Sequence, residues 1–426
     1  MDQTALVLIV AAAGVAVVVL LVTWLRVPAF IALAASSMLV GLAAGMPAAD
    51  IARAFQSGVG DTLCFIAMIV GIGTVIGKLL AESGGALVVS RSVIATLGEQ
   101  RIDWALMLSA LLIGLAVFFQ VGLVLLVPVL FTLARDSATP LLRLGIPMLA
   151  GLSVAHGLTP PHPGPLAAIE RLGADTGRTL LYSAIVGLPV AIVAGPVFGR
   201  FISPRVEVRA GAVAEQLTGA TTARRPPSLA ATLATILLPV ALMLVTSPLV
   251  AMLAAAFLSF YTFGGACGLD RARVLRFAEE AIPAVAGVLL VVGAGGGFGR
   301  VLDAAGVDTA IADVMGPLRL SPLVLGWSIA VLLRIAVGSA TVACVTAASI
   351  VAPMAAAMPG VSRELMVVAI GAGSLIASHV NDGGFWLVKE YFNMSVPQTV
   401  ATWTAMETII AIAGLAGVLL LALAAG

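Results

Sequence analysis

The sequence predicts an all-α polytopic membrane protein built from two inverted repeats, with about ten transmembrane crossings, two re-entrant hairpins and two broken helices. Composition is the first observation behind this prediction: 61% of the 426 residues are hydrophobic, 10% are charged and the mean hydropathy is +1.15. Soluble domains carry roughly 25% charged residues, so an ordinary soluble fold is excluded. The second and third observations are an interrupted pattern of apolar runs and a repeat at a fixed offset.

The charge balance and the cysteines indicate few partners beyond the lipid bilayer. The net charge of +1 gives no reason to expect a nucleic-acid partner. Cys64, Cys267 and Cys344 lie far apart within apolar runs, which is typical of small buried thiols rather than of a disulfide or a metal site. We therefore expect neither a cofactor nor a bound metal.

Apolar runs of about 20 residues predict the first elements in order. Residues 1–4 lack the positive charge of a signal peptide, so the first run is expected to remain as a span. Arg26 follows that run and indicates that the chain arrives there in the cytoplasm. The expected spans cover residues 5–25, 27–46 and 62–80, and a less hydrophobic interfacial helix covers 86–97.

Residues 104–134 form an apolar run that is too long for one span of about 20 residues and too short for two spans and a turn. Arg101 and Arg135 flank this run, so both of its ends are expected on the cytoplasmic side. The combination predicts a re-entrant hairpin with residues 120–122 at its tip.

Residues 156–165 read HGLTPPHPGP and cannot continue a helix, because proline lacks the N–H group and clashes with the preceding turn. Inside a membrane, freed backbone groups are tolerated only where they are buried in protein or line a cavity. We therefore predict a broken helix over 144–172 with a binding site at the break. A span over 179–199 follows.

Residues 200–228 contain five arginines and then Pro226 and Pro227, which predicts a flexible cytoplasmic linker. It divides the chain into a first repeat, 1–199, and a second repeat, 229–426. The elements expected in the second repeat are two spans within 229–266, a span over 280–298, an interfacial helix over 308–318, a hairpin within 321–358 with its tip at 338–341, a broken helix over 364–393 with its break at 378–384, and a span over 401–425.

The repeat is visible in the letters at an offset of 222 positions. Six residues of the first half correspond to six of the second: Gly71, Gly73, Gly77, Lys78, Leu80 and Gly84 to Gly293, Gly295, Gly299, Arg300, Leu302 and Gly306. The same offset relates Thr159 in the first break to Asn381 in the second. The first half crosses an odd number of times, so the second half starts from the opposite side and the repeats are inverted, as in many secondary transporters.

The titratable side chains gather at the two breaks. All three histidines of the chain, His156, His162 and His379, lie there, and Asp382 lies in the second break. Ionisable groups at membrane depth are functional by default and imidazole titrates near neutral pH, so we expect these four groups to carry protons. The alternatives are a structural role for the histidines, and pairing of Asp382 with a helix end or with Lys389.

Neutral polar groups at the breaks and hairpin tips suit a hydroxylated substrate or a small cation. The candidates are Thr159, Ser339, Thr341 and Asn381. The competing interpretation is that each hydroxyl bonds its own helix backbone. A substrate carboxylate is expected against the N–H groups that follow the breaks, near Gly164, Gly383 and Gly384, because half-helix N-termini carry partial positive charge.

Three further charged residues have open roles. Arg334 lies four residues before the second hairpin tip in an apolar arm, where either an anionic substrate or a structural salt bridge would explain it. Asp61 and Glu407 are acids near apolar runs, and nothing in the sequence places them at the site.

Four motifs resemble the gluconate permease family: HGLTPPHPGP from His156, GSATVA from Gly338, SHVNDGGFWLVKEYF from Ser378, and ESGGA from Glu82. The resemblance runs from about residue 54 to the C-terminus. It implies proton-coupled uptake of gluconate or of a related sugar acid, small hydroxy acid or amino acid, across the bacterial inner membrane. It also implies membership of a larger ion-transporter superfamily with inverted repeats and re-entrant hairpins, many of whose members work as dimers by an elevator movement. A homodimer is therefore expected.

One departure from that family concerns the first hairpin tip. The resemblance implies an acid there, whereas this chain has Gln120 within the run 118–122, FFQVG. Glutamine does not titrate, so proton coupling must use other groups or is weakened, and Gln120 becomes a candidate for binding the substrate.

Other functions stay open at this point. One is a carrier of another small organic anion coupled to another cation. A membrane metalloenzyme with His156, His162 and Asp382 as ligands is a second, although the sequence holds no HExxH motif. A channel or a non-transporting subunit is a third.

Overall fold

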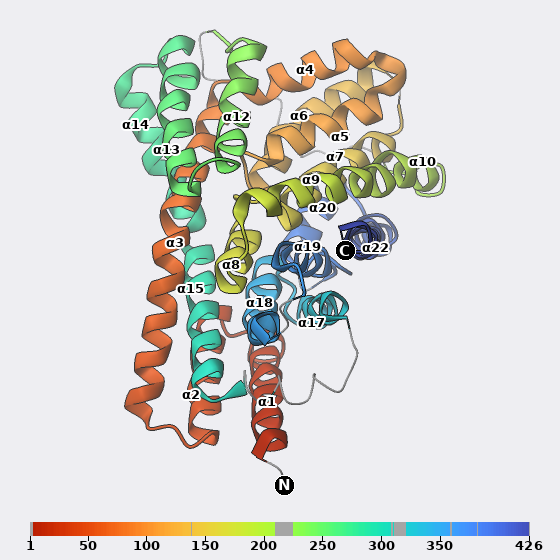
Figure 1. Ribbon diagram of the computed structural model, residues 1–426. Coiled ribbons are helices and arrows are strands. Elements are labelled where there is room, and N and C mark those ends of the chain that lie inside the picture. The colour runs from red at the N-terminus through yellow and green to blue at the C-terminus, as the bar shows by residue number, and fades with distance from the viewer. Residues whose placement is uncertain are drawn as a thin grey trace.

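The computed structural model describes residues 3–137, 139–208, 225–307, 310, 321–357, 360–380 and 382–425, and each regular element in these ranges is helical (Figure 1). Seven helices in this part of the chain are long and apolar enough to cross a membrane, and seven shorter apolar helices accompany them. The prediction of an all-α polytopic membrane protein is confirmed at this level. The count of about ten crossings stays a prediction.

The described residues of the first half form ten α-helices: α1 (Gln3–Thr23), α2 (Ala29–Ala43), α3 (Ala48–Glu82), α4 (Gly85–Leu97), α5 (Ile102–Gly114), α6 (Phe119–Asp136), α7 (Leu141–Leu158), α8 (Pro163–Leu172), α9 (Thr176–Ile192) and α10 (Phe198–Ile202). A π-helical turn, Val193–Val197, joins the last two.

The described helices of the second half are α12 (Leu229–Met243), α13 (Pro248–Ser259), α14 (Arg271–Ala281), α15 (Pro283–Ala304), α17 (Pro322–Val337), α18 (Ala340–Ala357), α19 (Arg363–Gly373), α20 (Gly383–Tyr391), α21 (Val396–Thr399) and α22 (Ala405–Ala425). A π-helical turn, Val400–Thr404, leads into α22. Apart from residue 310, the interfacial helix expected over 308–318 lies outside the described residues, and so do residues 209–224 of the linker.

Helices α3 and α15 pack side by side as the long column on the left of Figure 1. They run antiparallel: Lys78 near the end of α3 pairs with Glu280, which directly precedes α15, while Arg300 near the end of α15 pairs with Asp61. Glycine allows the close approach between them, since a Cβ on Gly58 would lie 2.4 Å from the carbonyl oxygen of Gly296. Helix α3 begins 14 residues before the expected span. Its first turns carry charged residues, so their hydropathy is too low to predict a membrane span there.

Helix α7 lies at the centre of the molecule. In the most apolar stretch of α7 and α8, 89% of the residues are buried. It crosses α19 in close contact, since a Cβ on Gly371 would lie 2.3 Å from the Gly157 carbonyl oxygen. The chain leaves helical geometry at residues 159–162, where the proline-rich motif predicts a break. The Ser183 hydroxyl donates to the freed carbonyl of Leu158 at 2.5 Å, so protein groups replace the missing water.

The second interruption is longer than the sequence predicts. Helix α19 ends at Gly373 and α20 begins at Gly383, so the non-helical segment starts four residues before the predicted break.

Figure 1 shows α5 and α6 beside α4 and α7, and α17 and α18 beside α19. In the first of these helix pairs the turn is at residues 115–118, before the predicted tip at 120–122, and Gln120 is the second residue of α6.

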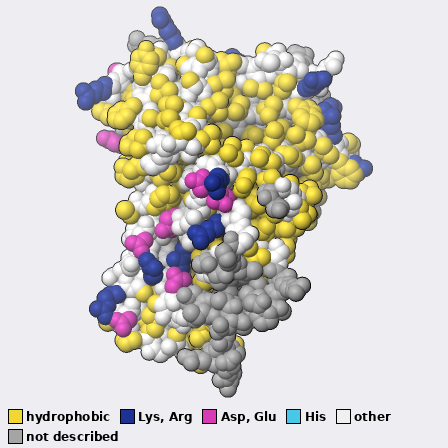
Figure 2. Space-filling view, viewed as in Figure 1, with side chains coloured by type: hydrophobic (Ala, Val, Ile, Leu, Met, Phe, Trp, Pro, Cys, Tyr) yellow, Lys and Arg dark blue, Asp and Glu magenta, His cyan; other side chains and the backbone are white. Residues whose placement is uncertain are grey.

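The outer surface suits a lipid environment. Figure 2 shows a face covered mainly by hydrophobic side chains, with charged side chains gathered in its lower part and at its upper edge. Large exposed apolar side chains occur on many helices, for example Leu42, Phe257 and Leu420. Such an exposed apolar surface is unfavourable in water and favourable against lipid.

Candidate functional site

One polar cavity of about 530 Å³ lies where both helix-pair turns and both breaks meet. Four short segments line it: Phe118–Val121 at the start of α6, His156 and Pro163 around the first break, Gly338–Val342 between α17 and α18, and Asp382–Gly384 at the second break. Ser153, Arg334, Trp403 and Glu407 complete the polar wall. Segments more than 200 residues apart in sequence therefore share one cavity.

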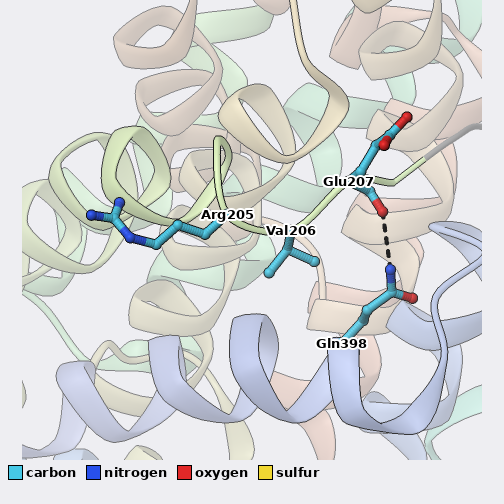
Figure 3. Close-up of a pocket in the computed structure, with 4 residues that line it drawn as sticks. All are labelled: Arg205, Val206, Glu207 and Gln398. Carbon is cyan, nitrogen blue, oxygen red and sulfur yellow. Dashed lines mark hydrogen bonds between the residues drawn. The ribbon is translucent and has the colours of Figure 1, made fainter.

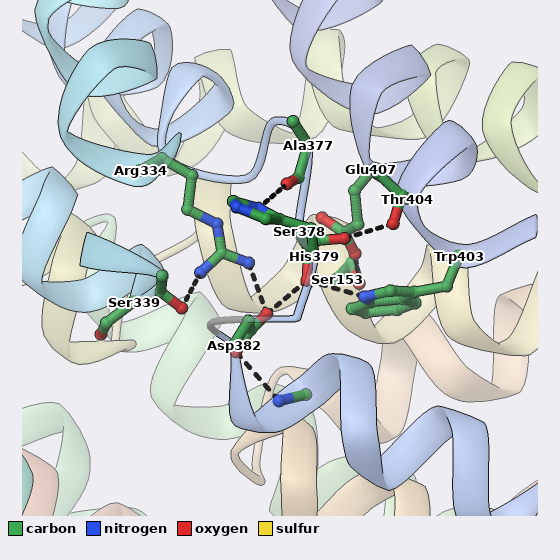
Figure 4. A network of polar contacts seen from close by, with 12 residues as sticks. Ser153, Arg334, Ser339, Ala377, Ser378, His379, Asp382, Trp403, Thr404 and Glu407 are labelled. Carbon is green, nitrogen blue, oxygen red and sulfur yellow. Dashed lines mark hydrogen bonds and ion pairs between the residues drawn. The ribbon is translucent and has the colours of Figure 1, made fainter. Parts of the chain in front are cut away.

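An ion pair between Arg334 and Asp382 lies in the wall of this cavity (Figure 4). The Arg334 Nη2 group lies 2.6 Å from Asp382 Oδ2, and Nη1 donates to the Gly338 carbonyl at 2.6 Å. The side chain of Arg334 is only 4% exposed, and its Nε has no partner. The guanidinium thus stabilises the end of α17 and keeps an unused donor beside the cavity.

Asp382 also begins α20. Its Oδ1 accepts from the Gly384 N–H at 2.9 Å, which is the arrangement of a helix N-cap. Its Oδ2 accepts from the Ser378 hydroxyl. Because the Gly384 N–H is used inside the chain, the Gly383 N–H is the nearer donor for a ligand at this helix end.

The second break is fixed to the π-helical turn before α22. The Trp403 indole Nε1 donates to Ser378 Oγ at 2.7 Å, and the Thr404 hydroxyl donates to the Ser378 carbonyl (Figure 4). Ser378 is 1% exposed. These contacts hold the carboxylate of Asp382 through Ser378, so the orientation of the break depends on residues just before α22.

Glu407 is a buried carboxyl in the first turn of α22, with 1% exposure. Its Oε1 accepts from the Ser153 hydroxyl of α7 at 2.5 Å, and its Oε2 has no hydrogen-bond partner. No Lys, Arg or His of the described chain forms an ion pair with it. A carboxyl was expected in the first hairpin tip and is absent there, while α22 brings one to the same cavity.

The histidines occupy three different environments. His156 lines the cavity and its Nδ1 has no partner. His162 is buried behind it, with ring centroids 5.2 Å apart, and its Nε2 lies 2.7 Å from the Gly114 carbonyl. His379 Nδ1 lies 2.8 Å from the Ala377 carbonyl, and this histidine does not line the cavity.

The structure therefore divides the predicted site residues into two groups. Seven line the cavity: Gln120, His156, Ser339, Thr341, Asp382, Gly383 and Gly384. Four of the described residues do not: Thr159, His162, Gly164 and His379. Gly164 packs against Thr341 and Cys344 of α18 and does not line the cavity. Asn381 lies outside the described residues.

Sequence reasoning did not assign Ser153, Trp403 and Glu407 to the site and left the role of Arg334 open. Ser153 and Trp403 sit in apolar runs without a motif, and they reach the cavity only through packing of α7 against α22. Arg334 gave the clearest signal, since a charge within an apolar helix requires a partner or a ligand.

A second hollow, lined by Arg205, Val206, Glu207 and Gln398, lies outside this site (Figure 3). There the Gln398 amide donates to the Glu207 carbonyl at 3.0 Å. This contact joins the chain after α10 to α21.

Apolar helices long enough to cross a membrane, together with a polar cavity lined by two interrupted helices, define the class of membrane transport proteins. The family model described as GntP family permease matches residues 6–247 and 244–424. The chain belongs to this family: it is a multi-pass membrane permease, a transporter and not an enzyme.

Relatives and structures agree with this assignment. The chain is 46% identical to a gluconate permease of Pseudomonas aeruginosa, with 95% of each chain covered. It is 41% identical to the high-affinity gluconate transporter of Escherichia coli, covering 97% of this chain and 99% of the relative. The fold matches that of the Alcanivorax borkumensis YdaH transporter with a TM-score of 0.67 at 16% identity, over 92% of this chain and 96% of the other. That structural likeness concerns the fold alone.

Proposed function

We propose that this permease carries gluconate or a closely related sugar acid into the cell together with protons across the inner membrane. The observation that carries the proposal is the buried Arg334 guanidinium in the wall of a cavity whose other polar groups include hydroxyl, amide, carboxyl and imidazole groups. A guanidinium is the side chain best suited to a carboxylate. The names of the similar permeases support gluconate as the first substrate to test.

The substrate carboxylate binds near Arg334, using its unpartnered Nε and the N–H groups at the start of α18 and at Gly383. Partial positive charge at these helix ends favours the anion. The hydroxyls of the sugar acid face Ser339, Thr341, Ser153 and the Gln120 amide. A cavity of about 530 Å³ lies within the range of roughly 300–1,000 Å³ that small-molecule sites occupy.

Proton coupling follows from the charge of the substrate. Moving an anion inward against a negative-inside potential costs about 2.3 kcal/mol per charge per 100 mV, and one proton per substrate removes that cost. Among the predicted proton carriers, His156 and Asp382 line the cavity, and His162 is the ring neighbour of His156. His379 is a carrier only if the second break rearranges during transport, because it lies outside the cavity.

The inverted-repeat architecture remains part of the proposal, with repeats 1–199 and 229–426 and a cytoplasmic linker over 200–228. Its support is that helix bounds recur at an offset close to 222: α5, α6 and α7 correspond to α17, α18 and α19. Lys78 and Arg300, which the offset equates, each pair with an acid of the other half: Lys78 with Glu280 at the end of α14, and Arg300 with Asp61 within α3. Five crossings in each half and two re-entrant hairpins follow from this symmetry. The elevator movement and the homodimer are part of the proposal through the family resemblance.

The test is uptake of radiolabelled gluconate into liposomes that contain the purified protein, under an inward proton gradient. Saturable accumulation that a protonophore abolishes supports the proposal. Uptake that depends on a sodium gradient and ignores the proton gradient contradicts the coupling. Competition by unlabelled sugar acids, small hydroxy acids and D-amino acids then ranks the substrates.

A further inference from the structure

We propose that the carboxyl group of Glu407 is the main proton-binding group of the cavity, and that its protonation sets the affinity for the anionic substrate. This inference rests on the proposed function, because it assigns the coupled proton of that transport cycle to one atom group. Its first support is position. Glu407 lines the cavity and its Oε2 has no partner, although the residue is 1% exposed.

The second support is the contrast between the two carboxyls of the cavity. Asp382 pairs with Arg334 at 2.6 Å and caps α20, so its negative charge is compensated. Glu407 has one hydroxyl, Ser153, and no cation within ion-pair distance in the described chain. An uncompensated charge in such a place is unfavourable, whereas the neutral acid keeps the contact with Ser153.

The charged or titratable groups that line the cavity together with Glu407 are Arg334 of α17, His156 of α7 and Asp382 before α20. The remaining charged or titratable groups on α7, α9 and α19 do not line it: Arg143, Arg178, Tyr182, Arg363 and Glu364. The charge of the cavity is therefore set by one guanidinium, two carboxyls and one imidazole.

Charge counting gives the coupling. With Glu407 ionised and His156 neutral, Arg334 offsets only one of the two carboxylates, and the cavity repels a substrate anion. When a proton from solvent binds Glu407 Oε2, the carboxylate becomes a neutral acid and the repulsion falls. Proton and anion therefore favour each other's binding, which is the reciprocal coupling that symport requires. Release of the proton on the other side restores the carboxylate and weakens the hold on the substrate.

The same assignment accounts for Gln120. The first helix-pair turn carries no acid in this chain, and α22 supplies a carboxyl to the cavity from another direction. A neutral Gln120 binds substrate hydroxyls without adding a second uncompensated charge near Glu407.

The experiment compares wild-type protein with Glu407→Gln in liposomes. Glutamine imitates the neutral acid and still contacts Ser153. We expect loss of the accumulation driven by a pH gradient, and gluconate binding to the variant that no longer changes with pH. With the membrane potential clamped at zero, one proton per substrate gives the wild type about tenfold accumulation for one pH unit, since a tenfold activity ratio is matched by a tenfold substrate ratio. The matched control is Glu390→Gln on α20, whose side chain is 66% exposed, and it keeps wild-type accumulation.

A second measurement uses the wild type and does not depend on the variant. Addition of gluconate to purified protein in weakly buffered detergent solution should take up protons, detected with a pH indicator. Accumulation by Glu407→Gln equal to wild type, or gluconate binding to the wild type without proton uptake, overturns the proposal. If the wild type does not carry gluconate, the proposed substrate is wrong instead, and the same comparison is made with the sugar acid or amino acid that it does carry.

Discussion

Arg334 and Asp382 form an ion pair at 2.6 Å that joins the end of α17 to the start of α20. Both residues line the cavity, and the same guanidinium holds the Gly338 carbonyl. The turn between α17 and α18 and the second break therefore share one charged contact. A ligand that binds Arg334 acts on both segments at once.

Arg334→Lys tests whether the shape of the guanidinium matters as well as its charge. Lysine keeps the positive charge but cannot contact Gly338, Asp382 and a carboxylate together in a planar fork. We expect gluconate binding to weaken roughly tenfold to a hundredfold, because a hydrogen bond to a charged group contributes about 1.5–3 kcal/mol. Isothermal titration calorimetry measures the change. Gluconate binding as tight as that of the wild type would contradict a direct role for the planar guanidinium group of Arg334.

Ser378→Ala tests the polar network that holds the second break. The substitution leaves the Trp403 indole N–H without its acceptor and Asp382 without one donor. We expect a loss of about 1–3 kcal/mol in the free energy of unfolding, measured by denaturant or thermal unfolding in detergent. Ser328→Ala is the control, since Ser328 is partly exposed and bonds only its own helix; equal stability of the two variants would refute the network.

Gly371→Ala tests the crossing of α19 over α7. The added Cβ would lie 2.3 Å from the Gly157 carbonyl oxygen, and backbone cannot move aside as a side chain can. We expect destabilisation of about 1–3 kcal/mol from overpacking. Gly60→Ala on α3 has open space around its Cβ and should be neutral or slightly stabilising. Similar melting temperatures for both variants would mean that the crossing is looser than the structure describes.

Cysteine labelling tests the orientation of the linker. In a Cys64→Ser background, which removes the exposed cysteine, Arg205→Cys should resist a membrane-impermeant maleimide added to intact cells and react after permeabilisation. Ala44→Cys, at the expected outer end of the second span, is the matched control and should react from outside. Labelling of position 205 in intact cells would reverse the proposed orientation.

Local chemistry made the two breaks and the residues around them predictable. Prolines and glycines stop a helix wherever they occur, so His156, Asp382 and the turn at Gly338 could be located from the sequence. The turn between α5 and α6 was predicted too late in the chain, because residues 104–134 are almost uniformly apolar and Gly114 is the one residue near the turn that favours an interruption.

Long-range packing determines which side chains line the cavity, and the sequence alone did not predict this. Ser153 and Glu407 are 254 residues apart, and no local pattern relates them. The same holds for Trp403, whose indole bonds Ser378 in the second break. Gly164 and His162 lie beside the first break, yet their surroundings direct them away from the cavity. Nearness to a motif identified the region of the site but not which side chains face its interior.

A structure of the protein determined with bound gluconate tests the central claim most directly, namely that the cavity between the two helix-pair turns and the two breaks is the substrate site. We predict density for one gluconate in that cavity, with its carboxylate at Arg334 and its hydroxyls toward Ser339, Thr341 and Gln120. Gluconate bound instead in another hollow, such as the one lined by Pro140, Arg143 and Arg200, with this cavity empty, would contradict the account.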